Sequence, residues 1–245
     1  MEFYFTYRLY QPVNLSTSMS TLHIDSLKKS YDTKLILSDI FLSCEKGEIK
    51  GLIGRNGSGK STLLKIIFGT ENAASKFVRV GDKIIRTVSG GRHLINYLPQ
   101  ENFLPNNTKV KTLINLFLPK KSRKLVLNNE HIKPILNHVN QDLSGGEKRI
   151  VEILLIIHSD AEFILLDEPF NGVSPIIKDY IIDYIKKLKS EKGFIITDHD
   201  YENVIQLSDS IVFLKDGFLK SIKEKSHLVG LGYLSQSAYD SIYKS

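Results

Sequence analysis

Apolar residues recur along the chain with two different periods, one typical of strands and one typical of helices. In the first hundred residues, alternating apolar positions and one short apolar run, EIKGLIG, predict strands. The strands are expected at 22–31, 35–44 and 48–54, near 77–86 and at 95–100, with a helix that begins at about Lys60. This half of the chain is therefore predicted to combine antiparallel β structure with one strand–loop–helix unit.

The second half of the chain alternates helices with strands. The expected order is helix 145–158, strand 163–167, helix 175–189, strand 193–197, helix 201–207 and strand 210–215. Alternation of this kind predicts an α/β fold with a mainly parallel sheet covered by helices. Ligands of such sheets bind beyond the carboxyl ends of the strands, which is where Gly54, Asp167 and Thr197 fall.

Residues 105–142 differ in character from the segments on either side. They contain three prolines, the basic cluster KKSRK at 120–124, and short helical patterns such as KVKTLINLFL. We expect a helical subdomain with outer limits at about 101–158, inserted in one domain that spans 21–245. Because no aromatic residues are interleaved with KKSRK, we interpret the cluster as a solvated basic loop rather than a contact for nucleic acid or lipid headgroups.

Composition and charge narrow the class of protein. With 42% hydrophobic and 24% charged residues, the 245-residue chain is typical of a globular protein and not of a disordered one. The net charge of +6 would suit an anionic partner such as a nucleic acid, a membrane surface or a phosphate-bearing ligand. The single cysteine, Cys44, fits a reducing compartment and a structural role.

Neither a membrane span nor a signal peptide is indicated. The longest apolar runs fall far short of the roughly 18 residues that cross a bilayer. The N-terminal stretch has an acid at Glu2 and no clean apolar run before a cleavage site. We therefore expect residues 1–20 to be an N-terminal extension, most of it upstream of a start at Met19.

The stretch GRNGSGKST, residues 54–62, fits the phosphate-loop pattern and stands between a predicted strand and a predicted helix. Its glycines allow backbone N–H groups to turn inward around phosphate oxygens, and the helix N-terminus adds a partial positive charge. Lys60 is expected to reach the β and γ phosphates, and the Ser61 hydroxyl to ligate Mg²⁺. The alternative is a plain glycine turn, which the pattern and its context disfavour.

Two adjacent acids, Asp167 and Glu168, end the apolar run in FILLDEPFNGVSP, residues 163–175. A magnesium nucleotide needs a carboxylate at the end of a neighbouring strand, and Asp167 has that position. Glu168, one residue later, is expected to face the γ phosphate and to polarise an attacking water. The alternative for Glu168 is a solvated acid at a strand end.

The stretch LSGGEKR, residues 143–149, has two interpretations. Ser144 and Glu147 are spaced as a capping box at the start of an apolar helix. Gly145 and Gly146 would also expose the N–H groups of that helix N-terminus as a second anion cradle. Two cradles per chain suggest that each nucleotide is held by two chains.

These motifs, in this order, resemble those of the ATP-binding cassette (ABC) ATPases, and the resemblance extends from about Thr21 to Tyr233. Tyr31 has the place of an adenine-stacking aromatic, Gln100 in YLPQ that of the Q-loop glutamine, and His199 in ITDHD that of the switch histidine. Each of these three alone would be an ordinary packing, loop or capping residue.

The resemblance implies a phosphate-loop ATPase fold and a full set of site residues. The nucleotide is assigned to Tyr31, Gly54, Asn56, Gly57, Ser58, Gly59, Lys60, Ser61, Thr62, Gln100, Ser144, Gly145, Gly146 and Glu147, the magnesium ion to Ser61, Gln100 and Asp167, and catalysis to Glu168, His199 and Lys60.

The family also implies partners. We expect a head-to-tail homodimer with ATP held between the two chains, a separate transmembrane permease as partner, no nucleic acid, and a place on the cytoplasmic face of the cell membrane. The main alternative is a soluble ATPase of the same family in a non-transport assembly. A third is a nucleotide-binding regulatory module with little turnover, which Glu168 and His199 disfavour.

Within the family, EPFNGVSPI, ITDHD and GYLSQ are most similar to the ATPases of lipopolysaccharide export and branched-chain amino acid uptake. The chain departs from the family pattern at Ser174, where an aspartate is usual, and in the short interval between Gln100 and Ser144.

Overall fold

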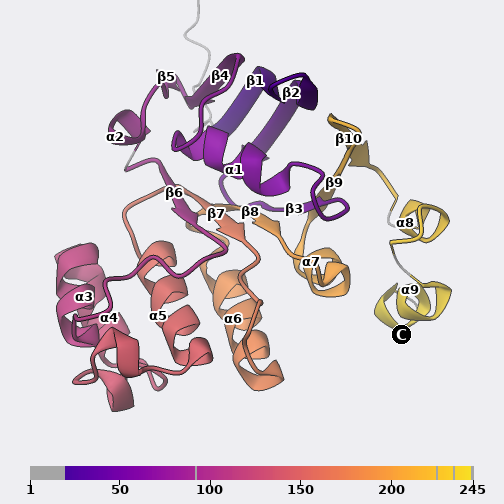
Figure 1. Ribbon diagram of the computed structural model, residues 1–245. Coiled ribbons are helices and arrows are strands. Elements are labelled where there is room, and N and C mark those ends of the chain that lie inside the picture. The colour runs from indigo at the N-terminus through magenta and orange to yellow at the C-terminus, as the bar shows by residue number, and fades with distance from the viewer. Residues whose placement is uncertain (1–19, 92, 225, 234, 244–245) are drawn as a thin grey trace, which may run out of the picture.

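The computed structural model describes residues 20–91, 93–224, 226–233 and 235–243. Figure 1 shows a β subdomain, a central sheet seen nearly edge-on, and a group of helices on the opposite side of that sheet. The predicted N-terminal extension, apart from Ser20, lies outside the described residues. No helix within the described ranges is long and apolar enough to cross a bilayer.

The β subdomain is a four-stranded antiparallel sheet in the order β2-β1-β4-β5. Its strands are β1 (Thr21–Tyr31), β2 (Lys34–Glu45), β4 (Ser75–Val80) and β5 (Lys83–Ile84). The hairpin between β1 and β2 turns at Asp32, whose φ of 48° is a left-handed conformation that aspartate tolerates better than most residues. The antiparallel β structure expected from the alternating pattern is confirmed.

The central sheet has six strands in the order β10-β9-β3-β8-β7-β6. They are β3 (Ile49–Ile53), β6 (Ile95–Leu98), β7 (Phe163–Asp167), β8 (Gly193–Thr197), β9 (Ser210–Lys215) and β10 (Phe218–Ile222). The pairings among β6, β7, β8, β3 and β9 are parallel, and β10 is antiparallel to β9. The predicted mainly parallel sheet is confirmed.

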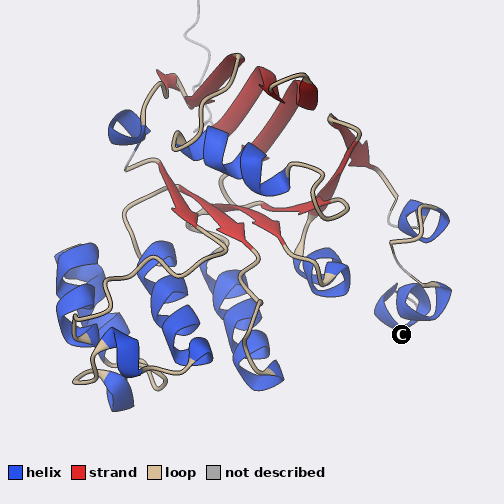
Figure 2. Cartoon of the chain, in the orientation of Figure 1, coloured by secondary structure: helices blue, strands red, loops and turns tan. Residues whose placement is uncertain are grey.

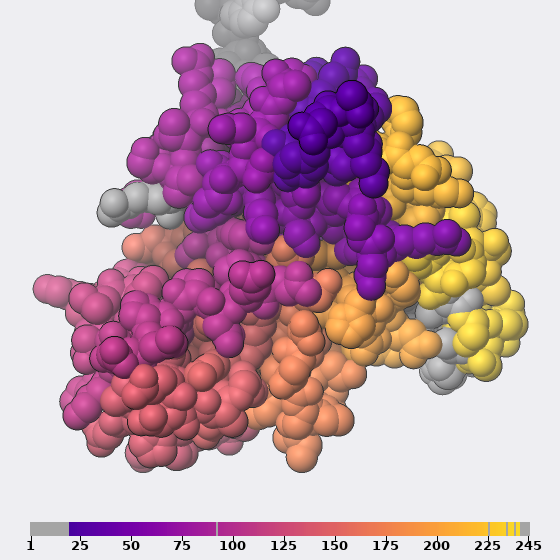
Figure 3. Space-filling model, viewed as in Figure 1, coloured from indigo at the N-terminus to yellow at the C-terminus, as the bar shows by residue number. Residues whose placement is uncertain are grey.

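Helices cover both faces of the central sheet, as Figure 2 shows. The helices are α1 (Lys60–Phe68), α2 (Val88–Gly91), α3 (Val110–Phe117), α4 (Lys120–Leu127), α5 (Gly145–Ile157), α6 (Pro175–Leu188), α7 (Tyr201–Leu207), α8 (His227–Gly230) and α9 (Gln236–Tyr243), with short 3₁₀ turns at Lys133–Ile135 and Asn140–Asp142. In Figure 3 the indigo strands β1 and β2 and the magenta-to-orange helices α3–α6 occupy opposite ends of the molecule.

Alternate residues of the central strands enter two different cores. Leu165 and Ile195 pack with α1 and the β subdomain. Ile164, Leu166 and Ile196 pack with α3, α5 and α6 on the other face. Because both faces are buried, these strands are apolar throughout, which is typical of parallel sheets.

The interpretation of KKSRK as a loop is wrong. Residues 120–124 begin α4, which follows Pro119 and buries Val126. The apolar residues of this helix, 125–127, come only after the basic cluster, and Val126 is its one deeply buried side chain. Its lysines are exposed, so the predicted solvation of the cluster is confirmed for Lys120, Lys121 and Lys124.

The topology brings the predicted ligand-binding positions to one edge of the central sheet. β3 and β7 both pair in parallel with β8, and Asp167 is paired with Thr197. The chain leaves β3 at Gly54, leaves β7 at Glu168 and leaves β8 at Asp198. Parallel strands end at the same edge, so these three exits lie together.

Candidate nucleotide-binding site

The phosphate loop connects β3 to α1 and depends on glycine for two different reasons. Gly57 and Gly59 have φ of 76° and 105°, left-handed conformations that a side chain disfavours. Gly54 needs space instead, because an added Cβ would lie 2.5 Å from the carbonyl oxygen of Leu214 on β9. Among the described residues no side chain caps the N-terminus of α1, so its first N–H groups are available to an anion.

Lys60 begins α1 and turns back over the loop. Its Nζ donates to the carbonyl oxygens of Gly54 at 2.8 Å and Arg55 at 3.3 Å. Burial lowers the pKa of the amine, and the nearby carboxylates of Glu168 and Asp167 oppose that shift. Lys60 is only 6% exposed, so its positive charge is held at the phosphate loop. A phosphate bound in the loop would be a natural partner for this charge.

Asp167, the last residue of β7, is fully buried. Its Oδ1 accepts a hydrogen bond from the Ser61 hydroxyl at 3.0 Å, and its Oδ2 accepts one from the Tyr97 hydroxyl at 2.9 Å. Burial raises the pKa of the carboxyl, and these two hydrogen bonds oppose the rise. Tyr97 was not among the predicted site residues, although it stands in the YLPQ motif three residues before Gln100.

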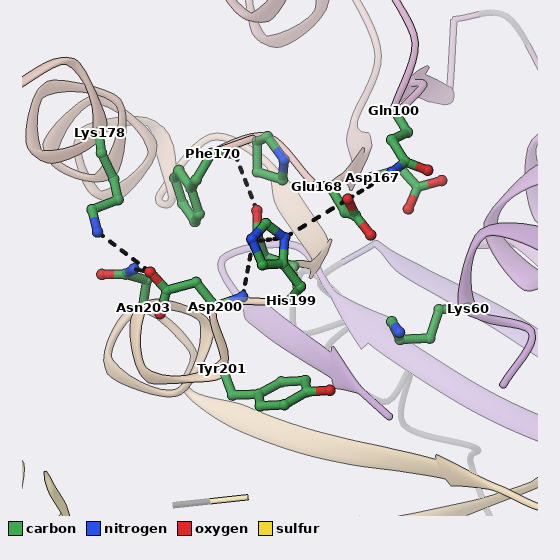
Figure 4. Close-up of polar contacts among 12 residues, drawn as sticks. Lys60, Gln100, Asp167, Glu168, Phe170, Lys178, His199, Asp200, Tyr201 and Asn203 are labelled. Carbon is green, nitrogen blue, oxygen red and sulfur yellow. Dashed lines mark hydrogen bonds and ion pairs between the residues drawn. The ribbon is translucent and has the colours of Figure 1, made fainter. Parts of the chain in front are cut away.

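Glu168 stands where the chain leaves the sheet. Its φ of 50° is left-handed, and its N–H donates to the Thr197 carbonyl at 2.7 Å. Its Oε2 accepts a hydrogen bond from Gln100 Nε2 at 2.8 Å and lies 3.8 Å from His199 Nδ1. Figure 4 shows the side chains of Gln100 and His199 directed toward Glu168 from two sides. Gln100 and His199, which are far from Glu168 in the sequence, therefore both lie at its carboxylate.

Asp198, a residue that sequence analysis also missed, fixes the loop that carries His199. Its buried carboxylate accepts hydrogen bonds from the backbone N–H groups of Phe170 at 3.1 Å and Asp200 at 3.0 Å. Its Oδ1 lies 3.2 Å from His199 Nδ1. The only sequence signal for Asp198 is its position in the motif ITDHD, directly before His199.

These residues surround a cavity of about 420 Å³ beside the phosphate loop. The lining residues are Tyr31, Ile36, Asn56, Gly57, Gly59, Lys60, Ser61, Thr62, Gln100, Glu168 and His199. Gly54 and Asp167 are not among the lining residues. Ser58 does not line it either, and its buried Oγ has no hydrogen-bond partner in the described part of the chain. Tyr31 is exposed at the cavity, with Lys29 Nζ 4.4 Å from its ring centroid.

The residues of LSGGE do not join this cavity within one chain. Ser144 caps α5 by accepting a hydrogen bond from the Glu147 N–H, while Glu147 accepts from the Ser144 N–H, so the predicted capping box is confirmed. Ser144, Gly146 and Glu147 line a separate cavity of about 500 Å³ together with Ser174. Gly145 has open space around it.

Comparison with known proteins gives a consistent result. The family model described as ABC transporter matches residues 37–171. The chain is 32% identical over 215 residues to the lipopolysaccharide export system ATP-binding protein LptB of Escherichia coli (strain K12), covering 82% of this chain and 89% of that protein. It is 31% identical over 222 residues to ABC transporter A family member 1 of Dictyostelium discoideum, but spans only 25% of that protein's length.

Solved structures have the same fold. A structure described as an ATP binding subunit of an ABC transporter aligns over 91% of this chain and 98% of its own, with a TM-score of 0.77 and 21% identity. A nucleotide-free ATP-binding cassette from an ABC transporter aligns over 90% of this chain and 99% of its own, with a TM-score of 0.73 and 22% identity.

Proposed function

The chain belongs to the ABC transporter family of ATP-binding ATPases, and from this premise we propose that it is the ATP-hydrolysing motor subunit of a membrane transporter. The observation that carries the proposal is the cavity in which the phosphate loop, Gln100, Glu168 and His199 meet. A carboxylate, an amide and an imidazole beside a phosphate cradle are the parts that water attack on a γ phosphate needs.

A magnesium ion fits the residues present. Asp167 is a fully buried carboxylate whose hydrogen-bond partners, Ser61 and Tyr97, are neutral hydroxyls. Buried carboxylates usually have a cation as partner, and Mg²⁺ prefers oxygen ligands of this kind. We propose that Ser61, Asp167 and Gln100 hold the ion, which when bound would neutralise charge on the β and γ phosphates.

The other side chains have distinct tasks in the proposed reaction. Tyr31, exposed at the cavity, stacks on the adenine, and Lys60 binds the β and γ phosphates. Glu168 takes the proton of the attacking water as general base. Gln100 and His199 hold the Glu168 carboxylate in place. Gln100 donates to its Oε2, and His199 Nδ1 lies 3.8 Å from the same oxygen.

The separate cavity at Ser144 and Ser174 supports a head-to-tail homodimer. In such a dimer the N-terminus of α5, where Gly145 and Gly146 have open space around them, faces the phosphates bound by the partner's loop. ABC ATPase subunits of transporters work with transmembrane components, and we propose a separate permease as partner, a peripheral position on the cytoplasmic face of the membrane, and no nucleic-acid partner.

Glu168→Gln tests the proposed function. The amide keeps the shape of Glu168 but cannot take a proton, so we expect ATP binding without turnover and accumulation of an ATP-bound dimer. Phosphate release measures turnover, and size-exclusion chromatography with ATP and Mg²⁺ measures the dimer. The matched control is Glu162→Gln, directly before β7 at the opposite edge of the sheet, which should hydrolyse at the parent rate. A Glu168→Gln variant that stays monomeric and turns over at the parent rate contradicts the assignment.

Recovery of a partner tests the transport role. Affinity purification of the full chain from detergent-solubilised membranes should bring down a polytopic membrane protein. If an ATP-hydrolysing chain instead recovers soluble proteins alone, the chain acts in a non-transport assembly.

A further inference from the structure

Two charged residues of α5 point into the protein interior. Arg149 is 3% exposed and Glu152 is 1% exposed, whereas the other buried residues of this helix are apolar. The pair is one turn apart, with Arg149 Nη1 at 3.4 Å from Glu152 Oε2. Taking two charges out of water is costly, and one contact of that length does not offset it. The other partners of the pair therefore need an explanation.

Arg149 donates mainly to the strand end that carries the two acids. Its Nη2 donates to the carbonyl oxygens of Asp167 at 2.9 Å and Glu168 at 2.8 Å, and its Nε lies 3.4 Å from the carbonyl oxygen of Pro169. These two carbonyls belong to the peptide units that lead into Glu168 and out of it, and the left-handed φ of Glu168 is an unfavourable conformation for a non-glycine residue. The guanidinium thus holds a strained backbone in place.

The same pair also holds the loop that carries Gln100. Arg149 Nη1 donates to the carbonyl oxygen of Pro99 at 2.8 Å, and Glu152 Oε1 accepts from the N–H of Phe103 at 3.0 Å. Gln100, between these two points, donates to Glu168 at 2.8 Å. The buried pair therefore anchors both ends of the loop from Pro99 to Phe103. It also anchors the backbone of Glu168, whose carboxylate accepts a hydrogen bond from that loop.

We propose that Arg149 and Glu152 are positioning residues, which set the geometry between Gln100 and Glu168 and couple it to the position of α5. The inference rests on the proposed function, because it assigns the pair a task in ATP hydrolysis. Neither residue lines the nucleotide cavity, so both act through the two residues that do.

The place of the pair on α5 gives the coupling its physical basis. Arg149 is five residues after Ser144, which is about 7.5 Å along a helix. The intervening turn is a regular helix with a closed capping box, so its two ends move together. Any contact that shifts the Ser144 end of α5 therefore also shifts the points that hold Gln100 and Glu168.

Arg149→Lys tests the proposal. Lysine keeps the charge, but its single nitrogen lacks the planar fork with which Nη1 reaches the Pro99 carbonyl and Nη2 reaches the two strand-end carbonyls. We expect kcat for ATP hydrolysis to fall about tenfold, with KM for ATP within about twofold, because positioning affects the transition state more than nucleotide binding. Glu152→Leu, which removes the acceptor for the Phe103 N–H, should behave in the same way. Glu152→Gln keeps an acceptor and should lose only about threefold.

A matched control separates positioning from stability. Lys192 is also a buried cation that donates to backbone carbonyls, those of Ser159 and Ala161, but at the opposite edge of the sheet. Lys192→Gln should lower the melting temperature while kcat stays within about twofold of the parent. If Arg149→Lys and Glu152→Leu lower the melting temperature in the same way with kcat unchanged, the pair is structural and the proposal fails.

The remaining outcomes are also decisive. If Arg149→Lys does not fold, Glu152→Leu and Glu152→Gln decide, and an unchanged kcat in both variants overturns the inference. A change in KM with constant kcat overturns it too. If Glu168→Gln hydrolyses at the parent rate, the proposed function fails. If that variant is inactive and the Arg149 and Glu152 variants are fully active, only the present inference fails.

Discussion

The hydrogen bond between Tyr97 and Asp167 offers a measurement of how the buried acid is stabilised. Tyr97→Phe removes the hydroxyl that donates to Oδ2 at 2.9 Å. It leaves the ring and its contact with Phe68, whose centroid lies 5.6 Å away. Asp167 keeps the Ser61 hydroxyl as its other donor. The substitution therefore isolates one hydrogen bond to a charge that is fully buried.

The expected loss follows from the charge and burial of the acceptor. A hydrogen bond to a charged group contributes about 1.5–3 kcal/mol, so we expect the free energy of unfolding to fall by about 2 kcal/mol near pH 7 without nucleotide. Burial already raises the pKa of Asp167, and the Tyr97 hydroxyl opposes that rise. Removing the hydroxyl raises the pKa of Asp167 further.

The sign of the pH dependence follows by linkage. The pKa of Asp167 is higher in the folded chain than in the unfolded chain, where it is about 3.9. Its contribution to the stability of the fold is therefore most favourable below the unfolded pKa and is lost as the pH rises through the folded pKa. Tyr97→Phe raises the folded pKa further, so the stability lost between low and neutral pH becomes larger. The difference in stability between variant and parent should therefore be larger near pH 7 than near pH 4.5.

Urea unfolding of nucleotide-free protein at the two pH values gives these differences. Tyr184→Phe is the matched control, because its hydroxyl contacts His158 Nε2 at 2.9 Å, and burial lowers the pKa of His158 to about 4. That neutral hydrogen bond should contribute only about 1 kcal/mol near pH 7. If Tyr97→Phe costs no more than Tyr184→Phe at neutral pH, or costs more at acid pH, the account of Asp167 as a buried anion is refuted.

Two further predictions concern the nucleotide. Lys60→Ala removes a charge-assisted contact of about 1.5–3 kcal/mol, so ATP should bind roughly 10-fold to 150-fold more weakly by calorimetry, and an unchanged affinity would count against the phosphate-loop assignment. Ser174 caps α6 by accepting from the Ile177 N–H, and aspartate caps about as well as serine. If Ser174 also contacts the partner chain, Ser174→Asp should raise the ATPase rate about fivefold with the melting temperature unchanged, whereas an equal or lower rate leaves Ser174 as a cap alone.

Much of the fold was predictable because its signals are local. The phosphate loop, the acids at the end of β7 and the capping box at Ser144 each occupy a few consecutive residues with a fixed spacing. The alternation of strands and helices then placed Gly54, Asp167 and Thr197 at one edge of a parallel sheet. The resemblance to ABC ATPases added Gln100 and His199 as expected site residues, and in the structure both side chains lie beside Glu168.

The residues that sequence analysis missed depend on partners that are distant in the sequence. Tyr97 contacts Asp167 across 70 positions, and Arg149 contacts Pro99 across 50. Neither pairing has a spacing rule, because the parallel sheet brings the partners together only after β6 and β7 have paired. A usable signal was present for Arg149 and Glu152, since two charges at core-facing positions of an apolar helix require buried partners.

The state of Lys60 bears on how tightly the loop can hold a nucleotide. Its amine already has two carbonyl partners, so a phosphate must replace those hydrogen bonds, and only the difference contributes to affinity. Gly54 would not be left without a donor, because its carbonyl oxygen also accepts from the Tyr201 hydroxyl at 3.1 Å. The Arg55 carbonyl oxygen likewise keeps a donor when Lys60 leaves, because it also accepts from the Ser58 N–H at 3.1 Å. Since neither carbonyl would be buried without a partner, releasing Lys60 costs little, and most of the attraction between ammonium and phosphate remains available for binding ATP.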